Sequence, residues 1–337
     1  MTSPITIESI GERALIERIR ARAGTPPAWI SLGIGDDAAV IVPERGRVDV
    51  VTTDSQIEGV HFRRDWTAPA AIGHKALAVN LSDLAAMGAA PRAVLLSLAL
   101  PSNLPATEFD ALIDGIVSLA DRECVPLAGG NLARSPGPVV IDITAIGSAH
   151  PRRVMTRAGG RAGDELYLTG SVGAAAAGLA RLQAGLDRAS LDADGLACVA
   201  QYERPEARLR CGVQVGRNRA ASACVDVSDG LADAARQLAG ASGCGVEIDA
   251  EAIPVHPGAT AWAAAAGSDP LLLALGGGED YELLFAVGKR QRRVFMAATA
   301  RCRGLAVTRV GRLTKDGGAW LIRREQREPL AQGFSHF

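Results

Sequence analysis

The stretch "ACVDVSDGLADAARQLAGASGCGVEID", Ala223 to Asp249, contains three patterns in direct succession. A short apolar run predicts a strand over 223–227, and the Ala-rich segment 230–241 has the spacing of a helix. A second apolar run predicts a strand over 245–249. A strand, a helix and another strand in this order are typical of a mixed α/β architecture.

The same alternation continues outward along the whole chain. In the first half we expect helices over about 7–22, 69–87 and 106–121, and strands near 38–42, 48–53, 93–100 and 138–147. In the second half we also expect helices near 173–184, 205–216 and 289–302, and strands near 165–169, 281–287, 306–311 and 319–323. The segment 148–166 between the halves is basic, Gly-rich and contains Pro. The sequence therefore predicts two α/β domains, over 1–149 and 150–337.

The composition excludes several classes of protein. Lys and Arg number 36 and nearly balance the 37 Asp and Glu, and no basic run with interleaved aromatics occurs, so nucleic acid is not expected as a partner. The charged N-terminus lacks the apolar core of a signal peptide, and no apolar run reaches the length of about 18 residues that a membrane span needs. Six scattered cysteines without CxxC spacing indicate free thiols. We expect a cytoplasmic protein with no membrane partner.

The common nucleotide and hydrolase motifs are absent or out of context. Gly33-Ile34-Gly35 with Ala38 nominally fits a relaxed dinucleotide fingerprint, but the chain continues into the predicted strand "AVIVP" instead of a helix. Asp36 beside this turn would also repel a pyrophosphate. No GxxxxGK[ST], HExxH or GxSxG motif occurs.

Acidic residues recur at the ends of the predicted elements. Asp36 and Asp37 precede a strand, Asp54 ends one, Asp226 and Asp229 lie where a strand meets a helix, and Glu279 precedes a strand. Any one of them is explained by the preference of Asp for turns and helix N-caps, and Asp229 before "GLADAARQL" fits a cap. Their recurrence is what requires another explanation.

Asp83 differs from these residues because it lies inside the apolar helical segment "ALAVNLSDLAAMG". Asn80 and Asp83 are three residues apart and share one helix face. Burial of a carboxylate without a partner is costly, so Asp83 needs either a basic partner such as Lys75 or a ligand.

Electrostatics limits what a convergence of these carboxylates can mean. Two charges 4 Å apart repel by about 4 kcal/mol at an effective dielectric near 20, so four or more acids in one place need raised pKa values or bound cations. Oxygen ligands without His or Cys select hard ions such as Mg²⁺, which commonly takes further ligands from phosphates. The sequence therefore points to nucleotide chemistry without a phosphate loop.

Seven motifs resemble, in content and in order, those of the thiamine-monophosphate kinase family, a branch of the aminoimidazole ribonucleotide synthetase-like superfamily. They are "GIGDDAAV", "TTDSQIEGVHF", "HKALAVNLSDLAAMGA", "TRAGGRAGDELYLTG", "DVSDGLADAARQLA", "GGGEDYELLF" and the closing "GFSHF". The resemblance extends from about residue 10 to Phe337. Seven motifs in a fixed order are far more specific than any one of them.

The resemblance implies a homodimer. The N-terminal domain (1–149) would bind ATP and Mg²⁺ and pair its strands with those of the partner in a barrel, and 150–337 would form a C-terminal α/β domain. The implied reaction transfers the ATP γ-phosphoryl group to thiamine monophosphate, without a covalent enzyme intermediate. The acceptor is already an anionic phosphate oxygen, so positioning and charge neutralisation matter more than a strong base.

The resemblance also assigns residues to roles. Metal ligands would be Asp36, Asp37, Thr52, Thr53, Asp54, Asp83, Asn131, Asp226 and Asp229. Asp54, Asp83 and Asp226 would be the catalytic carboxylates. The nucleotide would contact Gly130, Asn131, Arg157 and Ser228. Thiamine phosphate would contact His61, Glu279 and Phe334. Structural alternatives stay open: a strand-edge histidine for His61, a turn residue for Glu279 and a packed aromatic for Phe334.

One position departs from the family pattern. In the glycine-rich stretch "LAGGNLARSPG", Leu127 to Gly137, the family usually has aspartate after the two glycines, and here the residue is Asn131. An amide oxygen still ligates Mg²⁺ but brings no charge. We therefore expect weaker or fewer metal ions.

Two other functions compete with the kinase. A selenophosphate synthetase would need a reactive Cys near its N-terminus, and a hydrogenase maturation protein of this superfamily would need one at its C-terminus; the first cysteine is Cys124 and the chain ends "GFSHF". A non-catalytic binder of thiamine phosphate or nucleotide is supported by Asn131 alone.

Overall fold

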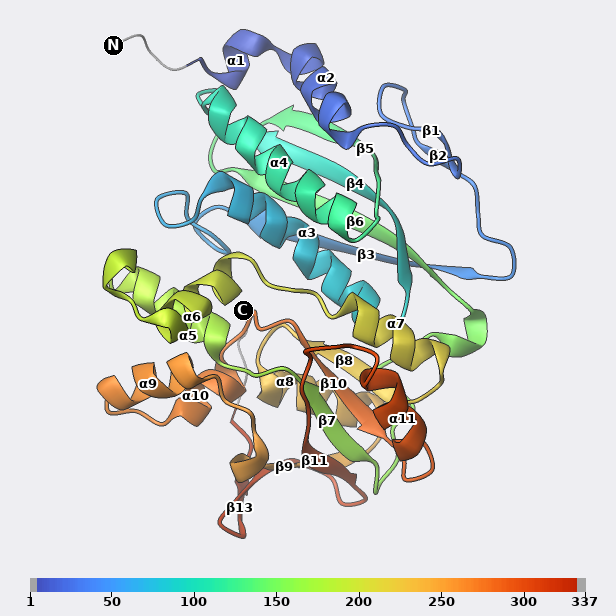
Figure 1. The fold of residues 1–337 in the computed structure, drawn as a ribbon, viewed down its shortest axis with the longest axis vertical. Helices are drawn as coiled ribbons and strands as arrows, with labels where there is room; N and C mark the ends of the chain where they lie inside the picture. The colour runs from blue at the N-terminus through green and yellow to red at the C-terminus, as the bar shows by residue number, and fades with distance from the viewer. Residues whose placement is uncertain (1–4, 332–337) are drawn as a thin grey trace. The chain divides into compact units, whose positions relative to one another are not determined.

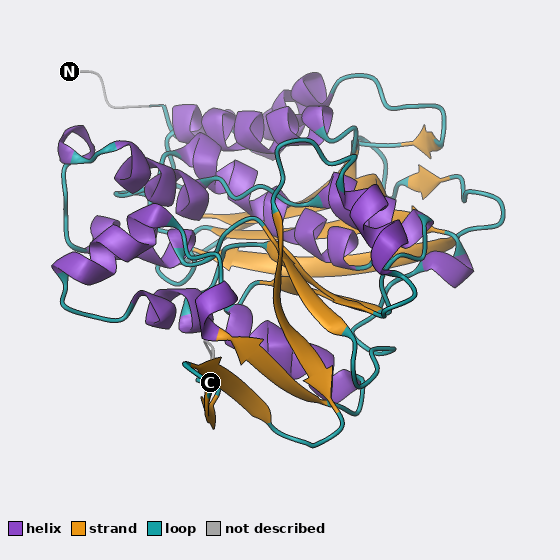
Figure 2. Ribbon diagram, turned by 60° about the horizontal axis from the view of Figure 1, so that its bottom comes forward, coloured by secondary structure: helices purple, strands orange, loops and turns teal. Residues whose placement is uncertain are grey.

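The protein, described here over residues 5–331 of a computed structural model, divides into two compact units (Figure 1). The first unit comprises Met1–Leu84 and Ala90–Pro151, and the second comprises Ala85–Ala89 and Arg152–Phe337. Each unit has its own sheet, with helices packed against it, as Figure 2 shows by secondary structure.

The first unit is built on a four-stranded sheet. Its helices are α1 (Ile7–Ile10), α2 (Glu12–Ala23), α3 (Pro69–Ala86) and α4 (Ala106–Arg122). Its strands are β1 (Ile30–Leu32), β2 (Val40–Ile41), β3 (Val48–Ile57), β4 (Ala90–Leu100), β5 (Leu127–Arg134) and β6 (Val140–Ala149). The large sheet has the order β3-β6-β4-β5, with only the β4–β5 pair parallel, and β1 and β2 form a separate ribbon.

Helices α3 and α4 lie side by side over one face of this sheet (Figure 1). They approach closely because glycine stands at the contact on both helices. A Cβ atom on Gly73 would lie 2.1 Å from the carbonyl oxygen of Leu112, and one on Gly115 would lie 2.0 Å from that of Ala70. Any larger residue at Gly73 or Gly115 would force the helices apart.

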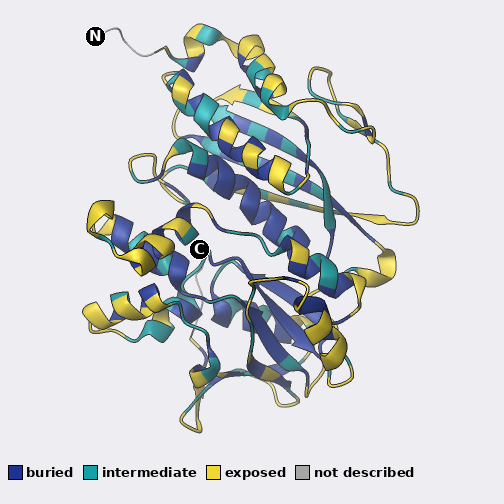
Figure 3. Cartoon of the chain, viewed as in Figure 1, coloured by how far each residue is buried: buried dark blue, intermediate teal, exposed yellow. Residues whose placement is uncertain are grey.

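The sheet of the first unit has one covered and one open face. Along β6 the side chains of Ile141, Ile143 and Ala145 are buried, whereas the alternate residues Asp142 and Thr144 are half-buried. This period of two is what a strand shows when only one of its faces packs on helices. Figure 3 colours each described residue of the chain by how far it is buried.

The second unit is built on a seven-stranded sheet. Its strands are β7 (Glu165–Thr169), β8 (Ala223–Val227), β9 (Gly245–Asp249), β10 (Glu282–Val287), β11 (Val307–Thr314), β12 (Ala319–Arg323) and β13 (Gln326–Pro329). Its helices are α5 (Ala174–Gln183), α6 (Ala193–Glu203), α7 (Leu209–Arg217), α8 (Leu231–Ala241), α9 (Pro257–Ala265), α10 (Pro270–Gly276) and α11 (Arg292–Thr299). The strand order is β13-β12-β9-β11-β7-β10-β8, and β9 with β12 is the only parallel pair in this described sheet.

The core of the second unit forms where α8 packs on the sheet. Leu231, Ala235 and Leu238 of α8 belong to one buried cluster with strand residues such as Leu168 and Leu284. Positions 231, 235 and 238 recur at the spacing of one helix face, which is the pattern that predicted this helix. Strand β10 is buried along its whole length, as expected for a strand covered on both faces.

Most expected elements are present, and the differences have local causes. The expected helix over 7–22 is two helices, because Gly11 adopts φ 81° between α1 and α2. The expected strand 48–53 continues to Ile57, so Asp54 lies inside β3 and does not end it. Helix α7 begins at Leu209, later than expected.

Five elements were not expected, namely β1, α6, α9, α10 and β13. A further strand that we did not expect lies in the glycine-rich stretch "LAGGNLARSPG". Its residues Leu127–Arg134 form strand β5, because the backbone pairs with β4 along its whole length.

Among the described residues, no helix has both the length and the apolar character needed to cross a membrane.

Candidate nucleotide site

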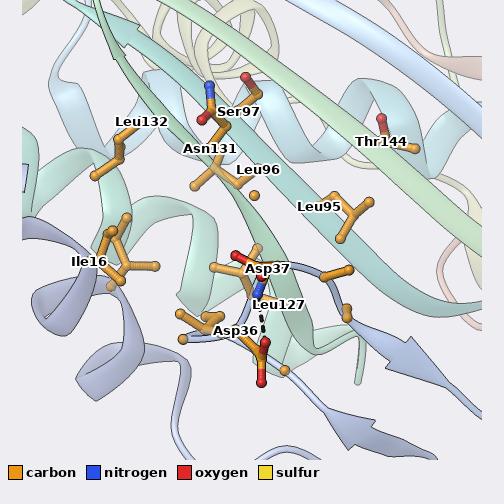
Figure 4. Close-up of a pocket in the computed structure, with 18 of the residues that line it drawn as sticks. Ile16, Asp36, Asp37, Leu95, Leu96, Ser97, Leu127, Asn131, Leu132 and Thr144 are labelled. Carbon is orange, nitrogen blue, oxygen red and sulfur yellow. Dashed lines mark hydrogen bonds between the residues drawn. The ribbon is translucent and has the colours of Figure 1, made fainter. Parts of the chain in front are cut away.

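A pocket of about 1340 Å³ opens on the uncovered face of the four-stranded sheet (Figure 4). Its floor is formed by residues of β4, β5 and β6, and its walls come from α2 and the loop between β1 and β2. The lining includes Arg13, Ile16, Asp36, Asp37, Leu95, Ser97, Gly129, Gly130, Asn131, Asp142 and Thr144. All of these residues belong to the first unit.

A polar row crosses the pocket floor. Ser97 of β4 pairs in register with Asn131 of β5 on one side and with Asp142 of β6 on the other. Residues that pair directly across strands point to the same face of a sheet, so the three side chains stand next to one another. Figure 4 shows Asn131 and Ser97 adjacent in the pocket. We did not expect Asp142, although the alternation in "VVIDITAI" gives it the opposite facing from its apolar neighbours.

Gly130 is required where β5 passes β4. A Cβ atom at this position would lie 1.8 Å from the carbonyl oxygen of Leu96, which is backbone and cannot move aside. Strand β5 therefore lies flat against β4 beside Asn131. The glycines of this stretch bring the strand, and with it the amide of Asn131, onto the pocket floor.

Asp36 and Asp37 lie in the loop that connects β1 with β2, at the pocket wall. Both residues are exposed, and the backbone N–H of Asp37 donates to Oδ1 of Asp36 at 2.8 Å. The following residues form strand β2, so no helix N-terminus stands at this turn. This agrees with the exclusion of a dinucleotide fingerprint.

Thr52, Asp54 and Asp83 occupy the other face of the sheet. Thr52 Oγ1 donates to Oδ2 of Asp83 at 2.5 Å, which brings two of the expected metal ligands together from β3 and α3. Asp54 alternates with Thr52 on β3 and shares its facing. Thr53 points to the open face, where it accepts a hydrogen bond of 3.1 Å from Thr144 Oγ1.

The helix that carries Asp83 also buries an incompletely satisfied amide. Asn80 is fully buried, and its Nδ2 donates to the carbonyl of Ala76 at 3.1 Å. Its Oδ1 has no hydrogen-bond partner among the described residues. Native interiors rarely leave a buried oxygen unpaired without a bound water, ion or ligand.

His61 follows β3 and has structural contacts of its own. Its Nδ1 accepts the backbone N–H of Ile57 at 3.1 Å, and its carbonyl accepts from the buried Lys75 at 3.2 Å. The first contact fixes the tautomer with the proton on Nε2. These contacts favour the alternative of a strand-edge histidine, and substrate contact by His61 stays a prediction.

The second unit brings together four of the expected site residues. Asp226 is buried near the end of β8, and Ser228 Oγ donates to Asp229 at 3.0 Å in the turn that follows. The backbone N–H of Glu279 donates to the carbonyl of Ser228 at 2.6 Å. Asp229 does not cap α8, because Gly230 is the N-cap residue and makes no side-chain cap bond.

Glu279 has an unusual backbone held in place by its neighbours. Glu279 and Tyr281 have φ values of 69° and 50°, a region that non-glycine residues adopt rarely and at a cost. Between them, Asp280 is fully buried and accepts the N–H groups of Gly173 and Ala175 at 2.6 and 3.0 Å. Burial raises the pKa of the Asp280 carboxyl to about 7, although these two bonds oppose the rise.

The structure gives less information about the remaining expected site residues. Arg157 is exposed in the loop before β7, and its carbonyl accepts from Ser242 Oγ at 3.0 Å. Phe334 lies outside the described residues. Within residues 5–331, no three His, Cys, Asp or Glu side chains lie close enough to hold a metal ion by themselves.

Comparisons with known proteins agree with this architecture. The family models of AIR synthase related proteins match both halves, the N-terminal domain over residues 35–149 and the C-terminal domain over residues 161–322. This sets the class as a two-domain AIR synthase related protein.

Individual relatives identify the family within this class. The thiamine-monophosphate kinase of Mycobacterium tuberculosis is 38% identical over 84% of this chain and 82% of its own length. The solved thiamine-monophosphate kinase of Stenotrophomonas maltophilia is 36% identical, covers 94% of this chain and 97% of its own, and superposes with a TM-score of 0.82. The chain belongs to the thiamine-monophosphate kinase family.

A second similar structure was solved with two ligands. AaThiL complexed with AMPPCP and TMP is 30% identical, covers all of both chains and superposes with a TM-score of 0.77. The resemblance that the seven motifs indicated is thereby confirmed.

Proposed function

We propose that the protein transfers the γ-phosphoryl group of ATP to thiamine monophosphate and releases thiamine diphosphate and ADP. The observation that carries this proposal is the likeness to AaThiL over the whole chain, because that protein is complexed with AMPPCP, an ATP analogue, and with TMP. The pocket supports it independently, since its volume of about 1340 Å³ is ample for a nucleotide.

The donor atoms of the pocket fit Mg²⁺. Its acidic lining residues are Glu12, Glu17, Asp36, Asp37 and Asp142, with Ser97 and Asn131 as neutral oxygen donors. Neither His nor Cys lines it, and hard divalent ions prefer such all-oxygen sets. When bound, Mg²⁺ would neutralise phosphate charge and let a triphosphate enter a pocket that is otherwise acidic.

The residues themselves have positioning roles in this proposal. Asp36, Asp37, Thr53 and Asn131 would hold the metal–nucleotide from the open face of the sheet. Thr52, Asp54 and Asp83 would form a second ligand group, supported by the bond from Thr52 to Asp83. Gly130 would let phosphate approach the strand closely. None of these groups needs to move a proton, because the acceptor phosphate oxygen is already anionic.

The second unit would supply further contacts. Asp226 and Asp229 are proposed as metal ligands, and Ser228 and Arg157 as nucleotide contacts, since the guanidinium fork of Arg suits phosphate oxygens. Glu279, His61 and Phe334 are proposed to contact the thiamine moiety, whose thiazolium is cationic and suits a carboxylate and an aromatic face. The strained backbone at Glu279 supports a functional role there.

We also infer a homodimer and a cytoplasmic location. Strand β3 lies at the edge of its sheet. Its residue Val51 is 61% exposed, and Val48 and Val60 are exposed as well. An exposed apolar edge strand favours pairing with another chain. Light scattering on the full chain tests this: Val51→Asp is expected to give monomers, and a native monomer contradicts the dimer.

ATP as co-substrate and six free thiols support a cytoplasmic location.

The product assay tests the reaction directly. Purified protein is incubated with ATP, Mg²⁺ and thiamine monophosphate, and thiamine diphosphate is measured beside the Asn131→Asp variant. Product from the native protein supports the kinase. Absence of product from the native protein together with activity of Asn131→Asp would support the non-catalytic binder instead. An Asp83→Asn or Asp54→Asn variant with normal turnover and normal Mg²⁺ dependence would contradict the role of these carboxylates.

A further inference from the structure

We propose that Asp142 supplies the carboxylate that Asn131 lacks, so that the divalent cation bound with the nucleotide lies beside β6 instead of beside the edge strand β5. This inference rests on the proposed function, because it concerns the cation that accompanies ATP in the same pocket. It assigns a ligand role to a residue that none of the motifs contains.

Strand register places Asp142 for this role. Asn131, Ser97 and Asp142 follow one another across β5, β4 and β6 on the open face. Neighbouring strands are about 4.8 Å apart, so Asp142 stands roughly 9–10 Å from Asn131 in the same row. At that separation the two residues do not share one Mg²⁺, whose ligands lie at about 2.1 Å, but both reach one cation–triphosphate unit.

A hydrogen bond orients the carboxylate. Ser55 of β3 pairs in register with Asp142, and its Oγ donates to Asp142 Oδ1. The side chain of Asp142 is half-buried and lines the pocket. With one oxygen held by Ser55, the other oxygen remains for a ligand in the pocket.

The charge balance of the pocket explains why a cation is needed here. Five acidic residues line it, and Arg13 is the only basic residue among its lining, all of which is described. A triphosphate entering alone would meet net repulsion. Asn131 adds no charge at the β5 end of the row, whereas Asp142 adds a full negative charge two strands away. The strongest attraction for a divalent cation along the row is therefore at Asp142.

Binding of Mn²⁺ in the presence of AMPPCP tests this inference without turnover. Free Mn²⁺ is measured by electron paramagnetic resonance on the full-length chain, in the native form and as Asp142→Asn, Asn131→Asp and the double variant. Asp142→Asn is expected to weaken Mn²⁺ binding at least tenfold. Adding Asn131→Asp to Asp142→Asn is expected to restore binding to within about threefold of the native value. The matched control is Asp49→Asn, which removes an exposed carboxylate from β3 outside the pocket lining and should change binding less than twofold.

Two results would overturn the inference: Mn²⁺ binding by Asp142→Asn within twofold of native, or no recovery in the double variant. Circular dichroism checks folding, and Asp142→Thr, which suits a strand, replaces the Asn variant if that fails to fold. The assay contains no thiamine monophosphate and needs no catalysis. A native protein that binds Mn²⁺ as expected but makes no thiamine diphosphate therefore contradicts the proposed function and leaves this inference standing.

Discussion

Two glycine-rich acidic stretches, "GIGDDAAV" in the first unit and "GGGEDYEL" in the second, have the same pattern and different physical states. In the first, Asp36 and Asp37 are exposed on the wall of a pocket. In the second, Asp280 and Glu282 are buried and have protein partners: two backbone N–H groups for Asp280, and Arg208 with Thr169 for Glu282. Glycine followed by an acidic residue therefore predicts a bend before a strand. The pattern does not predict whether the carboxylate binds groups of the protein or a ligand.

The partners decide which carboxylates are available to a ligand. A buried acid that is already bonded by the protein contributes to stability and cannot take a cation without losing those bonds. An exposed acid contributes little to stability and is available. Substitutions of Asp280 and Glu282 should therefore change folding, and substitutions of Asp36 and Asp37 should change only binding and turnover.

The largest effect is expected for Glu282→Gln. Glu282 is 2% exposed and accepts from Arg208 Nε at 2.7 Å and from Thr169 Oγ1 at 2.6 Å, so the variant leaves Arg208 without its counter-charge. The free energy of unfolding should fall by about 3–5 kcal/mol, measured by urea denaturation. The control is Glu247→Gln in the same sheet, because the partner of Glu247, Arg312, is 60% exposed. This variant should lower the free energy of unfolding by less than about 1 kcal/mol. Equal losses would remove the distinction between the two kinds of acid.

Asp280 should make stability depend on pH. Its pKa is raised by burial from 3.8 to about 7, so its contribution to stability is fully present below pH 4 and is lost as the pH rises through 7. Relative to Asp280→Asn, which does not titrate, the native free energy of unfolding should fall by up to about 1.4 kcal/mol per pH unit across this window. Denaturation curves at several pH values measure the difference. Parallel profiles for the two proteins would show that Asp280 does not titrate there.

Asp37→Asn tests the exposed stretch. Loss of one charge at the proposed cation site should lower kcat/KM for ATP about 100-fold, which corresponds to about 2.7 kcal/mol. The free energy of unfolding should stay within about 0.5 kcal/mol of native because the side chain is exposed. Steady-state kinetics and denaturation are measured on the same preparation, with Asp49→Asn as the exposed control. A variant that is destabilised and fully active would reverse the assignment.

The smallest effect is expected for Thr52→Val, which tests a case between the two extremes. Asp83 is half-buried and accepts from Thr52 Oγ1 at 2.5 Å, so the variant removes one orienting bond and keeps the charge. Loss of one hydrogen bond costs about 1 kcal/mol, or roughly fivefold in kcat. Thr52→Ser keeps the hydroxyl and should remain near native. If both variants lose activity equally, the hydroxyl does not orient Asp83.

Much of the fold could be predicted because long apolar patterns are local. Helix α3 and strands β8 and β9 follow directly from periodicity, and all three lie within a residue or two of their expected bounds. Strand β5 was missed because Gly129, Gly130 and Asn131 have low strand propensity. Pairing with β4 overrides that preference, and propensity reasoning contains no information about such a partner.

The candidate site could be predicted only in part. The motifs identified residues that the structure does bring together, such as Thr52 with Asp83 and Ser228 with Glu279. They did not identify Asp142, because its relation to Asn131 depends on the register of three strands. A register is a non-local property, and a one-residue slip would turn Asp142 to the opposite face.

Strand β7 occupies an interior position in the seven-stranded sheet, between β10 and β11, and both neighbours come more than a hundred residues later in the chain. During synthesis at roughly 5–20 residues per second, β7 leaves the ribosome many seconds before either neighbour exists. Its apolar residues and both of its edges are open for that time, which makes the interval the period of greatest aggregation risk. Slower translation between residues 170 and 314 should therefore lower the yield of soluble protein more than slower translation before β7.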